Sequence, residues 1–273
     1  MSSDAVTSIV GVLNVTPDSF SDGGRLRGVD EAIAAALSMV DAGAGWIDVG
    51  GESTRPGAAV VPEAEEQARV VPVIRELARR LAGRGTRLSV DTYKAETARA
   101  ALAAGATIVN DVSGGLLDPR ILGVAAGAGA AIVVGHLRGA PADMMKDVRF
   151  DDIVGEVGAE LRARVDAAHA AGCKEVWADP GIGFGKHTEH NLALLRHLPA
   201  LCKQVGAPIM VGVSRKRFIG EITGKPTTER AFGIAAAVTA AILGGAAAVR
   251  VHDVPAMRDV VAVADAIAGG SAS

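Results

Sequence analysis

The sequence predicts a single α/β domain folded as a (β/α)8 TIM barrel. Short apolar runs rich in β-branched residues alternate with amphipathic segments along the chain, which is typical of repeated βα units around a parallel sheet. Eight units can be counted, and a length of 273 residues suits a barrel, which routinely uses about 250 residues as one unit. A doubly wound open sheet is the alternative because periodicity does not show closure, and the count of eight favours the barrel.

The strands are expected where apolar character is nearly continuous, as in strands buried on both faces. These runs are residues 8–14, 45–50, 87–91, 107–111, 131–136, 175–179, 208–213 and 248–252. Eight helices are expected between and after them, where apolar residues recur near helical spacing. Examples are Val29, Ile33, Leu37 and Val40; Ile153, Val157, Leu161 and Val165; and Met257, Val260, Val261 and Val263. We expect residues 1–273 to form one domain, with residues 1–7 and 269–273 as flexible ends.

The longest uncharged stretch, residues 231–249, is long enough for a membrane span. It is mostly alanine and is interrupted by Gly244 and Gly245. The sequence therefore predicts a buried helix, a turn and a strand here, and no association with a membrane.

The composition points to small-molecule ligands. Acidic residues number 31 and basic residues 28, giving a net charge of −3, and the basic residues are scattered, which argues against nucleic acid or an anionic membrane surface as a partner. The only cysteines, Cys173 and Cys202, are far apart, so neither a disulfide framework nor a thiolate zinc site is indicated. We expect a cytoplasmic protein, because such sparse cysteine usage suits a reducing compartment.

Polar residues gather at the carboxyl ends of the predicted strands. They are Asn14, residues 50–57, Asp91, Asn110, Asp111, His136, residues 179–186, residues 214–217 and residues 250–253. In a barrel these positions share one rim, where enzymes of this fold place their active sites. Each residue alone has a structural explanation, and Asp111 is expected to cap the next helix. Their joint placement predicts a functional site.

Two features of this rim suggest an anionic ligand. Arg55 lies in a Gly/Ser/Thr-rich loop, and residues 214–217 add a run of basic side chains. The glycines at 181, 183 and 185 precede Lys186 but do not match a phosphate-binding loop, because Pro180 replaces its first glycine. They are expected to let a ligand ring approach the backbone closely. His187 and His190 lack a carboxylate at a ligand spacing, so no zinc site is expected there.

Seven segments carry a resemblance to a known family. They are residues 11–24 (GVLNVTPDSFSDGG), 48–57 (DVGGESTRPG), 89–92 (SVDT), 110–115 (NDVSGG), 179–186 (DPGIGFGK), 214–216 (SRK) and 250–252 (RVH). In this order, and over nearly the whole chain, they resemble the dihydropteroate synthases, a family of pterin-binding enzymes. The first two segments are long and specific.

The resemblance implies the condensation of 6-hydroxymethyl-7,8-dihydropterin diphosphate with p-aminobenzoate, which releases diphosphate and forms 7,8-dihydropteroate in folate biosynthesis. It also implies Mg²⁺, a homodimer and a target of sulfonamides. In this family the diphosphate leaves first, and the weakly nucleophilic arylamine then attacks a ring-stabilised methylene cation. Stabilising charge is therefore the main catalytic task.

The resemblance also implies the roles of individual residues. The catalytic residues would be Asp22, Asp91 and Lys216, with Asp22 near the cation. The substrate-binding residues would be Asp91, Asn110, Asp179, Lys216 and Arg250 at the pterin; Thr54, Arg55 and His252 at the diphosphate; Phe20, Pro56 and Phe184 around the aminobenzoate; and Ser214 and Arg215 beside them. Asn14 would meet Mg²⁺, which should arrive with the substrate phosphates because a lone asparagine is a poor metal site.

The fifth strand departs from the family pattern. The family usually ends this strand Met-His-Met, whereas this chain has Gly135-His136-Leu137. A lost methionine contact with the pterin costs roughly 0.3–1.5 kcal/mol, so we expect a weakened site that Gly135→Met would tighten by up to about tenfold. Three alternatives stay open: a pterin-binding methyltransferase domain, a catalytically weak pterin-binding paralogue, and a Schiff-base aldolase that uses Lys216.

Overall fold

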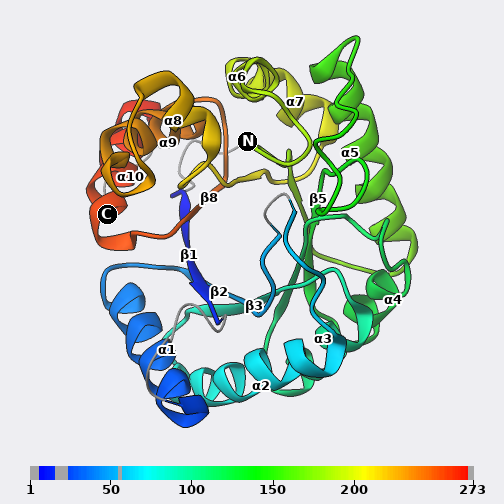
Figure 1. Ribbon diagram of the computed structural model, residues 1–273, viewed down its shortest axis with the longest axis vertical. Helices are drawn as coiled ribbons and strands as arrows, with labels where there is room; N and C mark the ends of the chain where they lie inside the picture. The colour runs from blue at the N-terminus through cyan, green and yellow to red at the C-terminus, as the bar shows by residue number, and fades with distance from the viewer. Residues whose placement is uncertain (1–5, 16–23, 55–56, 270–273) are drawn as a thin grey trace.

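Eight parallel strands form the centre of the molecule (Figure 1). The computed structural model describes residues 6–15, 24–54 and 57–269. The strands are β1 (Ser8–Asn14), β2 (Trp46–Gly50), β3 (Arg87–Asp91), β4 (Ile108–Asp111), β5 (Ala131–Gly135), β6 (Val176–Asp179), β7 (Met210–Val211) and β8 (Ala248–Val251). Each lies within a run that the sequence predicts.

The sheet is closed. Its order is β6-β5-β4-β3-β2-β1-β8-β7, and a parallel bridge between Ala178 and Ile209 joins the two end strands. At this seam the Ala178 amide donates to the Pro208 carbonyl oxygen at 2.9 Å. The predicted barrel is confirmed, and the open-sheet alternative is wrong.

Helices surround the barrel (Figure 1). They are α1 (Gly24–Asp41), α2 (Glu63–Arg80), α3 (Ala95–Ala103), α4 (Arg120–Gly127), α5 (Ile153–Ala170), α6 (Thr188–Arg196), α7 (Leu198–Val205), α8 (Arg217–Thr223), α9 (Ala231–Leu243) and α10 (Val254–Ala268), with a 3₁₀ turn at Thr227–Glu229. The expected eight helices are therefore too few for the described part of the chain, because two units contain a pair. Pro199 lies in the first turn of α7, where its missing amide is tolerated. Gly224 ends α8 in a left-handed conformation, and Pro226 follows.

The segment at residues 231–249 is a helix, a turn and a strand, as predicted. In the part of the chain that the structure describes, no helix has the length and apolarity needed to cross a bilayer. The expectation of a flexible end at residues 1–7 is wrong for Thr7, which is buried and whose amide donates to Asp265 at 3.0 Å. Residues 1–5 and 270–273 lie outside the described residues.

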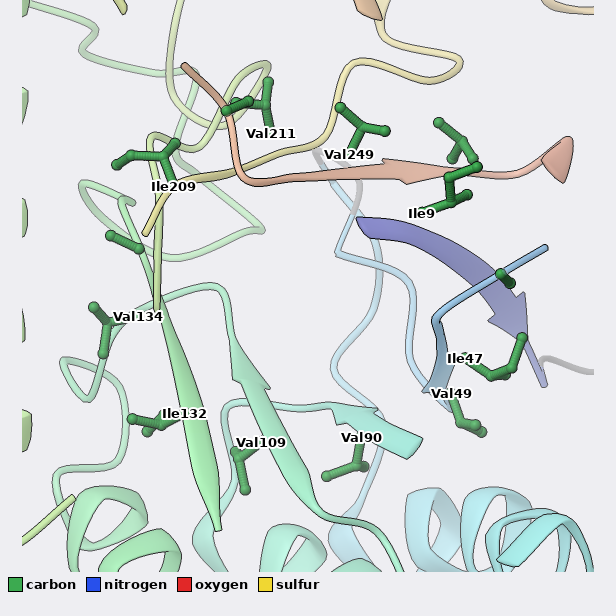
Figure 2. Packing of buried hydrophobic residues seen from close by; sticks show 14 of the residues in the cluster. Ile9, Ile47, Val49, Val90, Val109, Ile132, Val134, Ile209, Val211 and Val249 are labelled. Carbon is green, nitrogen blue, oxygen red and sulfur yellow. The ribbon is translucent and has the colours of Figure 1, made fainter. Parts of the chain in front are cut away.

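Alternating strand residues form two cores. One set points outward and packs against the helices: Ile9, Ile47, Val49, Val90, Val109, Ile132, Val134, Ile209, Val211 and Val249 (Figure 2). The other set fills the amino-terminal half of the barrel: Val10, Trp46, Ile108, Ala131, Val133, Met210 and Ala248, with Trp177 packed against them. The rings of Trp46 and Trp177 meet edge to face, 4.9 Å apart. The barrel is thus plugged at its amino-terminal end.

Candidate active site

Polar side chains replace apolar ones in the carboxyl-terminal half of the barrel. Side chains two positions apart on a strand share a face, so Asp48 follows Trp46 into the barrel, and Asn110 follows Ile108. The strand register also aligns Asn14 with Gly50, Gly50 with Asp91, and Asp91 with Asn110. A Cβ at Gly50 would lie 3.5 Å from Asp91 Oδ2 and 3.7 Å from Asn14 Oδ1. Asn14 and Asp91 therefore face the same space.

Arg250 is the centre of the charged network in this mouth. Its Nε donates to Asp48 Oδ2 and its Nη2 to Asp91 Oδ2, both at 2.6 Å. Asn110 Nδ2 donates to Asp48 Oδ2 at 2.9 Å, and the Ser89 hydroxyl donates to the other Asp48 oxygen. The guanidinium is therefore held from two sides, which fixes the group that the sequence assigns to the pterin ring.

Asp48 is a site residue that the sequence analysis missed. It is fully buried, yet its carboxylate accepts hydrogen bonds from β3, β4 and β8. The predicted site residues stand at strand ends, whereas Asp48 stands in the middle of the apolar run at residues 45–50. A buried charge inside a strand is costly unless it is paired. An aspartate in the middle of an apolar strand could therefore have been recognised in the sequence as a residue with buried partners.

Burial changes the proton affinity of the carboxyl groups. Desolvation raises the pKa of Asp91 to about 7; the Arg250 guanidinium opposes this rise and the Asp48 carboxylate adds to it. Desolvation also raises the pKa of Asp179, whose Oδ1 accepts from the Gly181 amide at 2.7 Å. The mouth thus offers carboxyl and amide groups with both donor and acceptor capacity, as the edge of a pterin ring requires.

Lys216 and Phe184 lie together where the loops after β6 and β7 meet. Lys216 Nζ is 3.8 Å from the centroid of the Phe184 ring, a cation–π contact. Burial lowers the pKa of Lys216 to about 8, and the Asp179 carboxylate opposes this change. Gly212 lies between Arg250 and Asp179, because a Cβ there would be in van der Waals contact with both, 3.8 Å from Arg250 Cβ and 4.0 Å from Asp179 Oδ2.

Ser214, Arg215 and His252 meet where the loops after β7 and β8 come together. Ser214 Oγ lies 3.0 Å from His252 Nδ1. Arg215 is exposed and has a φ of +61°, a left-handed conformation that is uncommon for residues other than glycine. A cavity of about 200 Å³ adjoins them, lined by Ser214, Arg215, Thr227, Thr228, Ala231, Ile234, Asp253 and Met257. Strain of this kind clusters at functional sites.

The remaining predicted residues divide into two groups. Thr54 is half-buried in the loop after β2. Phe20, Asp22, Arg55 and Pro56, which are expected around the cation, the diphosphate and the aminobenzoate, lie outside the described residues.

The expected helix cap at Asp111 is wrong, because the next helix, α4, begins after Pro119. Asp111 instead accepts hydrogen bonds from the Ser113 and Gly115 amides at 2.8 and 2.6 Å, so it orders the loop after β4. His187 precedes α6, and its amide donates to His190 Nδ1 at 3.2 Å. The two histidines therefore start a helix.

The expectation for Gly135 is wrong. A Cβ at this position would lie 2.5 Å from the Val112 carbonyl oxygen and 2.7 Å from Val112 Cα. The backbone after β4 already occupies the space that a methionine would need, so Gly135→Met cannot tighten the site without moving it.

The described residues contain no group of three or more His, Cys, Asp or Glu side chains arranged to hold a metal ion. Asn14 offers one half-buried amide oxygen at the mouth. One protein oxygen combined with phosphate oxygens and water is a donor set that fits Mg²⁺.

Comparisons with known proteins agree with this site. A family model for pterin-binding enzymes matches residues 10–252. A dihydropteroate synthase from Synechocystis is 47% identical over 264 residues, covering 96% of this chain and 90% of the relative. The structure of Xanthomonas albilineans dihydropteroate synthase with 4-aminobenzoic acid is 44% identical with a TM-score of 0.88, covering 98% of this chain and 94% of that one. A structure from the same organism in complex with 7,8-dihydropteroate is 41% identical with a TM-score of 0.84, covering 98% and 95%. The chain belongs to the pterin-binding enzyme family, among the dihydropteroate synthases.

Proposed function

We propose that this protein condenses 6-hydroxymethyl-7,8-dihydropterin diphosphate with p-aminobenzoate to give 7,8-dihydropteroate and diphosphate. The observation that carries the proposal is the convergence of Asp91, Asn110, Asp179, Lys216 and Arg250 on one barrel mouth. The chain shares this fold with a dihydropteroate synthase whose structure contains 4-aminobenzoic acid.

The pterin would bind deepest in the mouth. Asp91 and Asp179 would accept from the ring amino and amide groups, Asn110 would donate and accept, and Lys216 would donate to a ring nitrogen or oxygen. Arg250, held by Asp48, would lie against the ring. Since Asp48 and Asn110 are already hydrogen-bonded, little reorganisation is needed on binding.

Asn14, Thr54, Arg55 and His252 would bind the diphosphate. Mg²⁺ bound at Asn14 would neutralise charge on the diphosphate oxygens. Cleavage of the methylene C–O bond sends the electron pair to the diphosphate, and the amine nitrogen of p-aminobenzoate then forms the new C–N bond and loses a proton. Asp22 would stabilise the cation between these steps. Phe20, Pro56 and Phe184 would enclose the aminobenzoate, and Ser214 and Arg215 would border it.

A diphosphate-release assay tests the reaction. We expect release from the pterin diphosphate to require Mg²⁺, and dihydropteroate to form only when p-aminobenzoate is added. A methyltransferase domain would release no diphosphate, and a binding paralogue would bind the pterin without turnover. Trapping of Lys216 by borohydride with a carbonyl substrate would instead indicate an aldolase.

Two substitutions test the assigned roles. Asn14→Ala should raise the Mg²⁺ requirement more than it weakens binding of a pterin without diphosphate. Asp22→Asn should lower kcat and kcat/KM together and leave that pterin affinity nearly unchanged, the pattern of an interaction made mainly in the transition state. Normal turnover by Asp22→Asn would leave the cation to be stabilised by the departing diphosphate.

The proposal includes a homodimer in the cytoplasm. The α9 segment carries no charged residue, and Phe232 and Leu243 on it are 87% and 49% exposed. Val263 and Ile267 on α10, which packs against α9, are also exposed. Exposed apolar side chains on two helices that pack together suit a second copy of the chain. Light scattering should give twice the chain mass, and Phe232→Glu should give a monomer. Both cysteines are free, as expected in the cytoplasm.

A further inference from the structure

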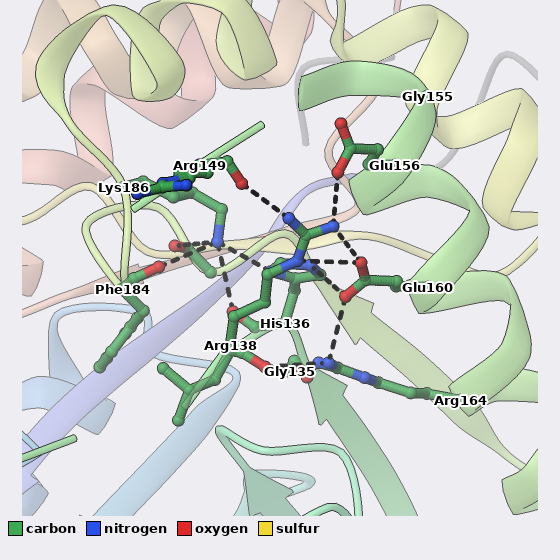
Figure 3. A network of polar contacts seen from close by, with 12 residues as sticks. Gly135, His136, Arg138, Arg149, Gly155, Glu156, Glu160, Arg164, Phe184 and Lys186 are labelled. Carbon is green, nitrogen blue, oxygen red and sulfur yellow. Dashed lines mark hydrogen bonds and ion pairs between the residues drawn. The ribbon is translucent and has the colours of Figure 1, made fainter. Parts of the chain in front are cut away.

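Lys186, at the end of the loop after β6, is buried and surrounded by acceptors (Figure 3). Its Nζ lies 3.0 Å from the Phe184 carbonyl oxygen and 3.1 Å from that of Gly181. It also lies 2.9 Å from His136 Nδ1 and 3.3 Å from the His136 carbonyl oxygen, at the end of β5. One side chain therefore connects the loop to the neighbouring strand.

The hydrogen-bond partners determine the tautomer of His136. When Lys186 is protonated its ammonium group only donates, so His136 Nδ1 accepts and the ring proton resides on Nε2. Nε2 lies 3.1 Å from Glu160 Oε2 on α5, and Glu160 also pairs with Arg138. Burial, reinforced by the charge of Lys186, lowers the pKa of His136 to about 3, which keeps the imidazole neutral.

The loop held by Lys186 carries the wall of the site. Gly181 and Gly183 have φ of +65° and +81°, and the Phe184 amide donates to the Gly181 carbonyl oxygen at 2.9 Å, so the loop is a tight turn. The Phe184 ring then lies under the Lys216 ammonium. If the Gly181 and Phe184 carbonyl groups lost Lys186, they would lose buried partners, and the turn would shift to reach water.

We propose that Lys186 is a positioning residue: supported by His136 and Glu160, it fixes the turn that places Phe184 against Lys216 and so shapes the aminobenzoate subsite. This inference deepens the proposed function and rests on it. Lys186 does not touch substrate in this role. Its effect on the reaction passes through the position of Phe184.

A double-mutant cycle tests the proposal. Lys186→Met removes the donors at similar length, and we expect it to raise the aminobenzoate KM about tenfold while kcat and pterin affinity change less than about threefold. Phe184→Ala should raise the same KM. Because Lys186 acts through Phe184, the double variant should resemble Phe184→Ala alone. Additive effects, or a loss of kcat without a KM change, would overturn the proposal.

The matched control is Lys203→Met on α7, which makes the same chemical change at an exposed lysine and should leave both KM values unchanged. If Lys186→Met does not fold, the tautomer of His136 in the wild-type protein remains a test. Nitrogen NMR of ¹⁵N-histidine-labelled protein below pH 7, where Lys186 keeps its proton and His136 is still neutral, should show an unprotonated Nδ1 and a protonated Nε2. A protonated Nδ1 would exclude the contact with Lys186 and overturn the inference. An inactive wild type would refute the proposed function alone, because the NMR result does not depend on turnover.

Discussion

Arg250 on β8 reaches past β1 to Asp48 on β2, with 2.6 Å between its Nε and Asp48 Oδ2. Asp48 is fully buried, whereas Asp91, the other carboxylate on Arg250, has a side chain that is 14% exposed. The two partners of one guanidinium therefore differ in what they contact. Asp48 faces protein groups only, and Asp91 faces the mouth where the pterin would lie.

We expect Asp48→Asn to destabilise the protein by about 3 kcal/mol, because it breaks a buried ion pair and leaves one acceptor oxygen for three donors. Urea unfolding measures this change. Pterin affinity should also fall, since Arg250 loses one of its two carboxylates. Asp91→Asn is the comparison: it should weaken pterin binding by roughly 1.5–3 kcal/mol, the range for a charge-assisted hydrogen bond, with a smaller loss of stability. Equal stability losses would contradict the division of roles.

Lys94 binds both ends of the loop that carries Thr54. Its Nζ lies 2.5 Å from Glu52 Oε2 at the start of this loop, 2.6 Å from the Val61 carbonyl oxygen at its end, and 2.9 Å from Glu66 Oε2 on α2. Lys94→Met would leave two carboxylates buried without a cation. We expect the free energy of unfolding to fall by about 3–5 kcal/mol.

Thermal or urea unfolding of Lys94→Met, compared with Lys174→Met at an exposed position, checks this value. The diphosphate-releasing activity should fall as well, because both ends of the loop lose their hydrogen bonds to Lys94. A variant as stable as the wild type would contradict this role of Lys94.

Gly135→Ala should destabilise the protein by about 1–3 kcal/mol, the usual cost of overpacking, because its Cβ would collide with Val112 backbone atoms. Gly123 on α4 offers a control, since a Cβ built there would have no atom within 4 Å outside its own stretch of helix. Gly123→Ala should therefore be neutral or slightly stabilising in its helix. If Gly135→Ala is tolerated as well as Gly123→Ala, the prediction is wrong and the Val112 backbone can move to accommodate the new Cβ.

Sequence periodicity located every strand, because a buried parallel strand is apolar along its whole length. It also located the mouth, because polar residues at strand ends must share one rim. It did not identify Asp48, whose role depends on which donors the barrel brings to it from other strands. It also misjudged Gly135, because the approach of the Val112 backbone depends on tertiary structure. The sequence predicted one helix after β6 and one after β7, whereas each of these segments contains two. Periodicity alone does not separate them, because the division depends on Pro199, Gly224 and Pro226.

The last prediction concerns Lys216, for which stability and activity should respond to pH in opposite directions. Burial lowers its pKa in the folded protein from 10.5 to about 8. Between these values the unfolded chain holds the proton and the folded protein releases it. By linkage, the contribution of Lys216 to the free energy of unfolding therefore rises as pH increases from about 8 towards 10.5.

Activity should fall over the same range, because the neutral amine loses the charge that supports its contact with the pterin and with the Phe184 ring. Burial also lowers the pKa of Lys186, to about 7, so Lys186 makes its own contribution to the rise in stability with pH. The measurement is therefore the difference in the free energy of unfolding between wild type and Lys216→Met. Only the wild type should gain this part of its stability, and only the wild type should lose kcat/KM above about pH 8. Parallel stability curves for the two proteins would show that Lys216 keeps its proton in the folded state, and the decline in activity would then have to come from another group.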